Sequence, residues 1–344
     1  MKSVAIESRC IDFDNDLRIE WKFTKRCNLD CSYCSKDIHD SVSKWRDLSE
    51  YKRAIDMLVG STNKNMWISF TGGEPCIYPQ FKELVKYCKE KGIYHVSATS
   101  NGSKSPEYYA SLEKYLDYLT ISYHFEYNVN CLESIFAAKE AFGGIRKFNV
   151  HIMMLPGYFK EAEDVMKILK DRDIQFTTRR IRPLYMADGS VARPHQKGGD
   201  IKRTLTSGPD YSDDKDYYSK KELEFFNPGK PMSKEPNIHH FIETENGVEE
   251  ILENTNDILA RKNNNFKGWK CWAGIQTLGI GFNGTIYNAD CKSKALGNIY
   301  TDNDIKFPTE PFICHRDWCV CVTTINTRKV KDDRYIKYLR DIPK

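Results

Sequence analysis

The sequence predicts an α/β protein with a parallel sheet and helices outside it. Between residues 18 and 178, six short apolar segments alternate with five segments whose apolar residues recur at helical spacing. Parallel strands need such crossover helices, so the alternation indicates strand–helix units. The chain has 344 residues, enough for two domains or for one large domain with insertions.

The predicted strands are short and rich in apolar residues. A first strand at 3–11 is separated from the rest by a turn at Asp14-Asn15-Asp16. The six strands of the predicted sheet then follow in order, at 18–23, 66–70, 93–99, 118–123, 148–155 and 174–178.

The predicted helices carry apolar residues three and four positions apart. Asp47 or Ser49 can cap the first, whose apolar face contains Tyr51, Ala54, Ile55 and Leu58. Pro106 follows Ser105 at the start of the third, where a missing backbone N–H is tolerated. This third helix is predicted at 105–115. The second, fourth and fifth helices are predicted at 81–88, 132–142 and 161–170.

The second half of the chain has a different character. We expect a core domain at 1–185, a polar insertion or linker at 186–268 and a small C-terminal domain at 269–344. The insertion is either a flexible surface connection or a lid, because long loops in compact proteins are often functional. Asn-Gly pairs predict two hairpins, at 241–252 and 277–288, and a helix is expected at 256–261.

Composition restricts the compartment and the partners. Lys plus Arg number 52 and Asp plus Glu 48, a net charge of +4, which does not favour nucleic acid as a partner. The basic run at 193–203 is interpreted as a solvated loop. No apolar run reaches the roughly 18 residues of a membrane span, and the N-terminus lacks a signal-peptide core. Twelve cysteines without a signal peptide indicate reduced thiols and metal ligands in a cytoplasmic protein.

Three cysteines follow the first strand of the predicted sheet within eight residues. Cys27, Cys31 and Cys34 can converge only if the chain loops around one object, since neighbouring side chains of a strand point to opposite faces. An iron–sulfur cluster takes such thiolate ligands, and three of them leave one iron open for a ligand. A zinc knuckle is the alternative, but zinc sites usually pair C-x2-C with a second, distant pair.

With Tyr33 before its last cysteine, the Cys-x3-Cys-x2-Cys motif resembles that of the radical S-adenosylmethionine (SAM) superfamily. The resemblance implies a partial (β/α)6 TIM-type barrel, a [4Fe–4S] cluster on the three cysteines, and SAM bound at the open iron. Reductive cleavage of SAM then gives a 5′-deoxyadenosyl radical. It also implies an electron donor of flavodoxin or ferredoxin type.

A glycine-rich segment ends the second strand of the predicted sheet. Gly72 and Gly73 allow close backbone approach, and Glu74 can accept hydrogen bonds from an ammonium group. By itself this is an ordinary turn, but its position matches the superfamily's motif for the SAM amino group. The resemblance therefore implies that Gly72, Gly73 and Glu74 bind SAM.

Polar residues also end the later strands. Ser100, Asn101 and Ser122 are candidates for SAM contacts by the same resemblance, although Asn101-Gly102 is also a strong turn signal. His124 contacts SAM, contacts substrate or is a hydrogen-bonded barrel histidine, and we favour the last.

The ends of the fifth and sixth strands supply further candidates. Met154 is expected to be a core residue rather than an adenine contact. Arg179, Arg180 and Arg182 can hold an anion at the rim of the barrel or form surface charge.

Five further cysteines lie near the C-terminus: Cys271, Cys291, Cys314, Cys319 and Cys321. A cysteine, a glycine-bearing hairpin, another cysteine and a final cysteine group resemble the SPASM/twitch extensions of radical SAM enzymes. The resemblance implies one auxiliary [4Fe–4S] cluster, with one thiol to spare among the last three. A structural zinc site is the alternative.

The sequence thus predicts a radical SAM enzyme of oxidoreductase or maturase type. Hydrogen abstraction from a substrate carbon would lead to oxidation, epimerisation or crosslinking. The substrate is expected to be a small molecule of sugar, aminocyclitol or nucleoside type, or a peptide. Many peptide-modifying relatives carry an N-terminal leader-recognition domain, and only 26 residues precede Cys27, which disfavours a leader-guided peptide substrate. The alternative class is a non-catalytic electron-transfer or zinc-binding protein.

Overall fold

The fold was analysed in a computed structural model of the chain. The structure describes residues 2–9, 12, 15–34, 38–127, 131–143, 147–181, 185–186, 201–202, 217–226, 236–261, 263–319 and 322–339. Most of the predicted polar insertion, and the cysteine at position 321, lie outside these residues. Within them, no helix is long and apolar enough to cross a membrane.

The described residues form one large sheet with the order β15-β14-β13-β2-β3-β4-β5-β6-β7. Six neighbouring strands, from β2 to the edge strand β7, are parallel and follow chain order: β2 (Asp16–Thr24), β3 (Asn65–Gly72), β4 (His95–Ser100), β5 (Tyr118–Tyr123), β6 (Phe148–Met154) and β7 (Phe176–Arg180). The predicted α/β class and its six parallel strands are confirmed. The described strands form no closed barrel, and β7 and β15 are the sheet edges.

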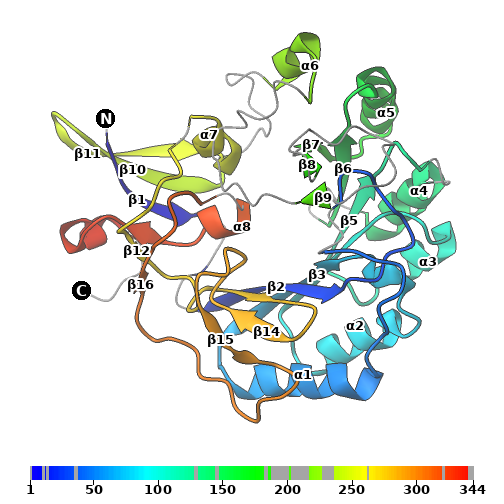
Figure 1. The fold of residues 1–344 in the computed structure, drawn as a ribbon, viewed down its shortest axis with the longest axis horizontal. Coiled ribbons are helices and arrows are strands. Elements are labelled where there is room, and N and C mark those ends of the chain that lie inside the picture. The colour runs from blue at the N-terminus through cyan, green and yellow to red at the C-terminus, as the bar shows by residue number, and fades with distance from the viewer. Residues whose placement is uncertain are drawn as a thin grey trace.

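Five helices connect these strands and cover the outer side of the sheet (Figure 1). They are α1 (Leu48–Gly60), α2 (Phe81–Glu90), α3 (Pro106–Ser111), α4 (Cys131–Phe142) and α5 (Phe159–Asp171). All five were predicted, although α3 ends four residues earlier than expected. A 3₁₀ turn, η1 (Pro75–Ile77), follows β3.

The core lies between the sheet and these helices. Alternate residues of β3, Met66, Ile68 and Phe70, are buried there, as period-two patterning requires. The four residues predicted for the apolar face of α1 are the four that it buries. Burying each such side chain stabilises the fold by about 1.5–3 kcal/mol.

The opposite face of the sheet carries polar and aromatic residues. Near the N-terminal ends of β2 and β3, the guanidinium of Arg18 lies 5.2 Å from the Trp67 ring centroid. Trp67 in turn stacks on His95, with ring centroids 4.4 Å apart. This stack occupies the face that does not contact the helices.

A second sheet has the order β11-β10-β1-β17-β12-β16 and lies beside the first (Figure 1). Its strands are β1 (Lys2–Ser8), β10 (Ile238–Thr244), β11 (Gly247–Glu253), β12 (Lys270–Cys271), β16 (Phe312–Ile313) and β17 (Lys329–Val330). β1 pairs with β10 and β17, whereas β2 belongs to the large sheet. The two N-terminal strands therefore separate, which the predicted turn between them did not indicate.

The C-terminal segment joins both sheets. The predicted hairpins are confirmed as β10–β11 and as β13 (Thr277–Ile280) with β14 (Thr285–Tyr287). β13 pairs in parallel with β2, and β15 (Ala295–Asn298) extends the hairpin. This pairing places the C-terminal segment against the strand that leads into the cysteine loop.

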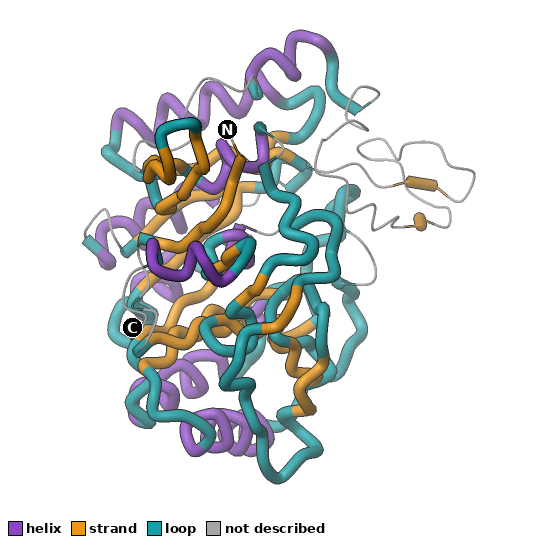
Figure 2. Tube along the Cα trace, turned by 90° about the vertical axis from the view of Figure 1, so that its left-hand side faces the viewer, coloured by secondary structure: helices purple, strands orange, loops and turns teal. Residues whose placement is uncertain are grey.

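Short elements complete the described structure. They are β8 (Tyr185–Met186), β9 (Ile201–Lys202), α6 (Lys220–Phe225), α7 (Thr255–Ala260), α8 (Val322–Ile325) and η3 (Asp333–Tyr338). The helix predicted at 256–261 is confirmed as α7. Figure 2 shows helices and long loops gathered on different sides of the strands.

Candidate active site

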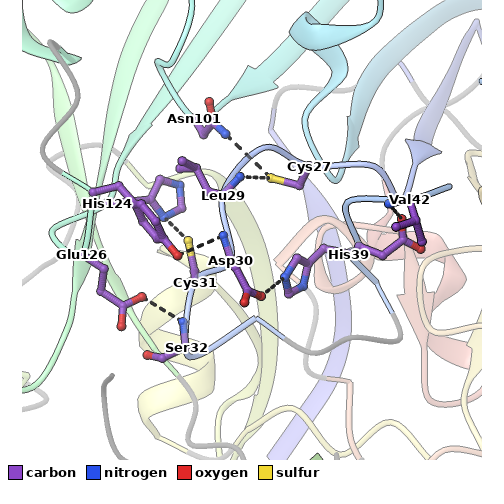
Figure 3. Close-up of polar contacts among 12 residues, drawn as sticks. Cys27, Leu29, Asp30, Cys31, Ser32, His39, Val42, Asn101, His124 and Glu126 are labelled. Carbon is purple, nitrogen blue, oxygen red and sulfur yellow. Dashed lines mark hydrogen bonds and ion pairs between the residues drawn. The ribbon is translucent and has the colours of Figure 1, made fainter. Parts of the chain in front are cut away.

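The cysteine loop follows the C-terminal end of β2 and faces the ends of β4 and β5 (Figure 3). The Sγ atom of Cys27 accepts hydrogen bonds from the Leu29 backbone N–H at 3.4 Å and the Asn101 side-chain amide at 3.8 Å. The Sγ atom of Cys31 lies 3.5 Å from Nδ1 of His124. Two of the three loop sulfurs thus meet polar groups from neighbouring strand ends.

Residues beyond the end of β5 hold the backbone of this loop. Ser32 donates its N–H to the Glu126 carboxylate at 2.8 Å (Figure 3). Asp30 donates its backbone N–H to the Tyr127 hydroxyl at 3.0 Å. The carboxylate of Asp30 is also 3.1 Å from Nε2 of His39. These bonds restrain the loop between its cysteines.

Tyr33 lies against His124. The tyrosine hydroxyl is 2.5 Å from Nδ1 of the histidine, and the two rings are nearly parallel. Burial lowers the pKa of His124 to about 4, so its ring is neutral at neutral pH. The expectation of a hydrogen-bonded histidine fits this geometry, which also shows contact with the cysteine loop.

Burial controls the protonation of the loop thiols. It raises the pKa of both the Cys27 and the Cys31 thiol above the ordinary value. Cluster binding requires thiolates, so it must release protons from these residues. Among the described residues, no three His, Cys, Asp or Glu side chains are arranged around a single metal ion.

The two glycines at the end of β3, Gly72 and Gly73, pack against the start of the cysteine loop. The Gly73 N–H donates to the Thr24 carbonyl at 2.6 Å. A Cβ atom would lie 2.4 Å from the Thr24 carbonyl oxygen at Gly72, and 2.3 Å from that of Arg26 at Gly73. Gly72 also has a φ of 122°, which favours glycine. These residues therefore permit close contact between the two segments.

The carboxylate of Glu74 is buried and joins the ends of β3 and β4. One oxygen accepts from the Cys76 N–H at 2.8 Å and the Ser100 hydroxyl at 2.9 Å. The other accepts from the Asn101 N–H at 2.5 Å. Burial raises the pKa of this carboxyl. Three protein donors occupy a group that has about four acceptor sites.

The remaining predicted polar residues have different environments. Ser100 is 2% exposed, and its hydroxyl also lies 2.7 Å from that of Tyr109. The side-chain amide of Asn101 donates to Asn28 at 3.0 Å as well as to the loop sulfur. Ser122 is buried on β5, and His124 directly follows the end of that strand.

The two described arginines at the end of β7 have separate contacts. Arg179 donates to Nε2 of His151 at 2.9 Å. The guanidinium of Arg180 lies 4.9 Å from the Phe226 ring centroid. Met154 is fully buried in the core, as expected. The arginine at position 182 lies outside the described residues.

The segment 217–226 packs over the ends of β6 and β7, which sequence reasoning missed. The Tyr218 hydroxyl donates to the Met154 carbonyl at 2.9 Å and accepts from the Ile181 N–H at 2.9 Å. Its aromatic residues share a hydrophobic cluster with Tyr33 of the cysteine loop. The adjacent tyrosines in an otherwise polar insertion were the available signal.

Three of the C-terminal cysteines gather in one place. Cys271, Cys291 and Cys314 pack together with Ala273 and Ala289. Burial raises the pKa of Cys271 to about 11. The structure does not place Cys319 in this group.

Cys319 packs in a separate apolar cluster with Ile6, Phe266 and Trp269. Its N–H donates to the Asn264 carbonyl at 2.9 Å. The other candidate for a fourth ligand, Cys321, lies outside the described residues. The thiol group 271/291/314 therefore contains three described cysteines.

An ion pair connects the C-terminal thiol group with β2. Lys22 on β2 pairs with Asp290, the residue before Cys291. Both side chains are about three-quarters buried, with relative exposures of 26% and 22%. The strand that enters the cysteine loop is thus tied to the loop that carries Cys291.

Comparison with known proteins identifies the domain that contains the cysteine loop. Residues 21–181 match the family model described as the Radical SAM superfamily. The chain therefore carries a radical SAM superfamily domain, whose family implies a [4Fe–4S] cluster and SAM. The loop's thiols, with N–H groups directed at the Cys27 sulfur, fit a cluster whose sulfurs accept hydrogen bonds.

Curated relatives resemble limited parts of the chain. GTP 3′,8-cyclase of Chlorobaculum tepidum is 39% identical over 80 residues, covering 23% of this chain and 24% of that protein. S-adenosylmethionine-dependent nucleotide dehydratase RSAD2 of Danio rerio is 32% identical over 114 residues, covering 32% and 30%. The chain thus spans less than a third of the length of these relatives.

A solved structure resembles more of the fold. Streptococcus suis SuiB bound to precursor peptide SuiA has a TM-score of 0.51 and 16% sequence identity, covering 84% of this chain and 64% of that one. At this identity, the likeness concerns the fold alone.

Proposed function

We propose that the chain is a radical SAM enzyme in which Cys27, Cys31 and Cys34 bind a [4Fe–4S] cluster. The observation that carries the proposal is the position of these thiols. They lie in one loop of the radical SAM domain, between the ends of β2, β4 and β5. When bound, the cluster and SAM supply a 5′-deoxyadenosyl radical that removes a hydrogen atom from a substrate carbon.

The surrounding residues prepare the loop for its cofactors. Asn101 directs an N–H at the Cys27 sulfur, while Glu74 holds the Asn101 backbone. Gly72 and Gly73 bring the end of β3 against the loop. We assign SAM contacts to this region, with candidate residues Tyr33, Gly72, Gly73, Glu74, Ser100, Asn101 and Ser122. The segment 217–226 packs beside Tyr33 and can help to exclude water.

An auxiliary [4Fe–4S] cluster at the C-terminal thiol group is part of the proposal. Three described thiols, Cys271, Cys291 and Cys314, pack together there. The fourth ligand is assigned to Cys319 or Cys321. Because Cys319 packs in another apolar cluster, its use would require local rearrangement. The grouping of these three cysteines supports assignment of the C-terminal segment to the SPASM/twitch type.

The substrate belongs to one of two classes, a small molecule or a peptide. The similar fold of SuiB, a protein solved with a precursor peptide, supports the peptide class. The nucleotide named in one relative supports the small-molecule class. Oxidation, epimerisation or crosslinking would follow hydrogen abstraction. We propose a flavodoxin or ferredoxin as electron donor and the cytoplasm as the location.

The test is anaerobic reconstitution with iron and sulfide, followed by reduction with dithionite in the presence of SAM. We expect 5′-deoxyadenosine and methionine to form, and Cys31→Ala to abolish both. Cys88→Ala is the matched control, because Cys88 is a buried cysteine on α2, outside either thiol group. Iron-loaded wild-type protein that forms neither product would overturn the enzyme proposal and favour electron transfer.

A further inference from the structure

The inner face of the large sheet lines an open polar cavity of about 330 Å³. Five consecutive strand positions in the sheet, β3 to β7, line it, on the face that does not contact the helices. Most of its lining side chains bear hydroxyl groups, among them Ser69, Ser97, Thr99, Tyr118, Thr120 and Thr177. The volume is within the usual range of small-molecule sites, roughly 300–1,000 Å³.

This lining differs from an ordinary barrel interior. Such interiors are filled by layers of branched apolar side chains. Here Ala98 is the only apolar residue among the described lining, and Asn149 and Gln175 add side-chain amides. Polar side chains of this kind form hydrogen bonds with water or with a polar ligand, so apolar packing does not fill this space. The cavity must hold water or a polar ligand.

The charge of the lining selects among polar ligands. No Asp or Glu is found among the described lining residues, and Arg179 supplies a positive charge. Nε2 of His151 accepts a hydrogen bond from Arg179 at 2.9 Å, so this histidine does not compete as a second cation. Arginine pairs well with carboxylate and phosphate groups. A ligand with an anionic group near Arg179 and hydroxyl groups near the serine and threonine side chains would match the polar groups of the cavity.

The cavity lies close to the cysteine loop. Thr99 is two residues before Asn101, whose side chain reaches the Cys27 sulfur. Thr120 is four residues before His124, which contacts the Cys31 sulfur. Two residues of a strand span ~7 Å and four span ~13 Å, so a small ligand in the cavity would extend toward the loop.

We propose that this cavity binds a small hydroxylated anion, with its carboxylate or phosphate at Arg179, as the substrate or as part of it. Its role as a substrate site rests on the proposed function. Its role as a binding site rests on the cavity alone. The proposal favours the small-molecule class over a peptide, because the cavity volume is near the lower end of the range for small-molecule sites.

Calorimetric binding to the reconstituted enzyme with SAM tests the proposal. The probes are ribose 5-phosphate, gluconate, uncharged ribose and cationic glucosamine. We expect at least one anionic probe to bind about tenfold or more tightly than ribose, with glucosamine weakest. Binding of ribose 5-phosphate alone would indicate a phosphate ligand, and binding of gluconate alone a carboxylate ligand. If neither anion exceeds ribose, the proposal is overturned.

Two variants locate the binding. Arg179→Met removes the cation, and Asn149→Asp places a carboxylate in the cavity at nearly unchanged volume. Each variant should lower the binding affinity for the anionic probe by at least about tenfold. Arg172→Met is the matched control, because this arginine lies over the Phe136 ring at the end of α5 and should leave binding unchanged. Unaltered anion binding in both cavity variants would place the anion elsewhere and reject the site.

The two proposals can fail separately. Formation of 5′-deoxyadenosine by the wild-type enzyme without any probe tests SAM cleavage alone. Formation of 5′-deoxyadenosine without selective anion binding would reject the proposed cavity ligand and leave the enzyme proposal standing. Selective anion binding without formation of 5′-deoxyadenosine would leave the binding site standing and reject the enzyme proposal.

Discussion

The Glu74 carboxylate accepts the Asn101 backbone N–H at 2.5 Å, and the side chain of the same asparagine reaches the Cys27 sulfur. One buried carboxylate thus connects the glycine-rich segment, the end of β4 and the cysteine loop. A role in positioning the loop follows from these contacts, whether or not the carboxylate also meets SAM.

Glu74→Gln should disturb this connection without a change in size. An amide in place of the carboxylate removes charge-assisted bonds and directs N–H groups toward existing donors. We expect a loss of about 1.5–3 kcal/mol in the free energy of unfolding, measured by urea denaturation. Glu90→Gln is the control, since Glu90 forms an exposed ion pair with Lys86 and should change little. Equal effects of the two variants would contradict the assigned role.

Gly73→Ala should displace the cysteine loop. The new Cβ atom would lie 2.3 Å from the Arg26 carbonyl oxygen, so backbone must move. We expect destabilisation of about 1–3 kcal/mol and poorer cluster incorporation, measured by urea denaturation and iron content. Gly60→Ala is the matched control, because nothing lies within 4 Å of its Cβ position at the end of α1. It should be neutral or stabilising. Normal iron content in the Gly73 variant would show that close contact is unnecessary.

His151 should make the fold sensitive to mild acid. Burial, with a smaller effect of Arg179, lowers the pKa of this histidine to about 3. The unfolded chain binds a proton near pH 6.5 and the folded chain does not, so stability falls as pH drops through this range. Between pH 7 and pH 5, His151→Gln should reduce the loss of unfolding free energy by about 2 kcal/mol. Urea denaturation of cluster-free protein at the two pH values measures this difference. An identical loss in both proteins would contradict the depressed pKa.

Removal of a C-terminal thiol tests the auxiliary cluster by metal content. Reconstituted wild-type protein should hold about eight irons, and Cys271→Ala about four, because each cluster contains four. Cys131→Ala is the control, since this thiol packs against Gly102 in the large core. Zinc in place of the second set of irons would support the zinc alternative. Wild-type protein with about four irons and no zinc would exclude both the auxiliary cluster and the zinc site.

Local patterns predicted most of the large sheet. Helical spacing identified the buried face of α1, because Tyr51, Ala54, Ile55 and Leu58 recur once per turn. Asn-Gly pairs located both hairpins, since their turns need residues that tolerate positive φ. In contrast, the pairing of β1 with β10 joins residues at least 230 positions apart. No local pattern specifies such a partner.

The candidate site was predictable in its parts but not in its connections. Cysteine spacing singled out Cys27, Cys31 and Cys34, and the position of Gly72–Glu74 after a strand marked the second segment. The bond between Glu74 and Asn101 depends on neighbouring parallel strands that bring their ends together. The polar cavity was missed, because β4 and β5 had been interpreted as apolar segments and their alternating polar residues drew no prediction.

The sequence by itself determined the α/β class, the alternation of strands and helices and the thiols available for metal, because these depend on residue type and short-range spacing. Tertiary structure decided which of these groups meet. It placed Cys271, Cys291 and Cys314 together, put Cys319 in a separate apolar cluster, and tied Asp290 to Lys22. Such contacts depend on the packing of two sheets whose strands come from opposite ends of the chain, and spacing along the chain carries no record of that packing.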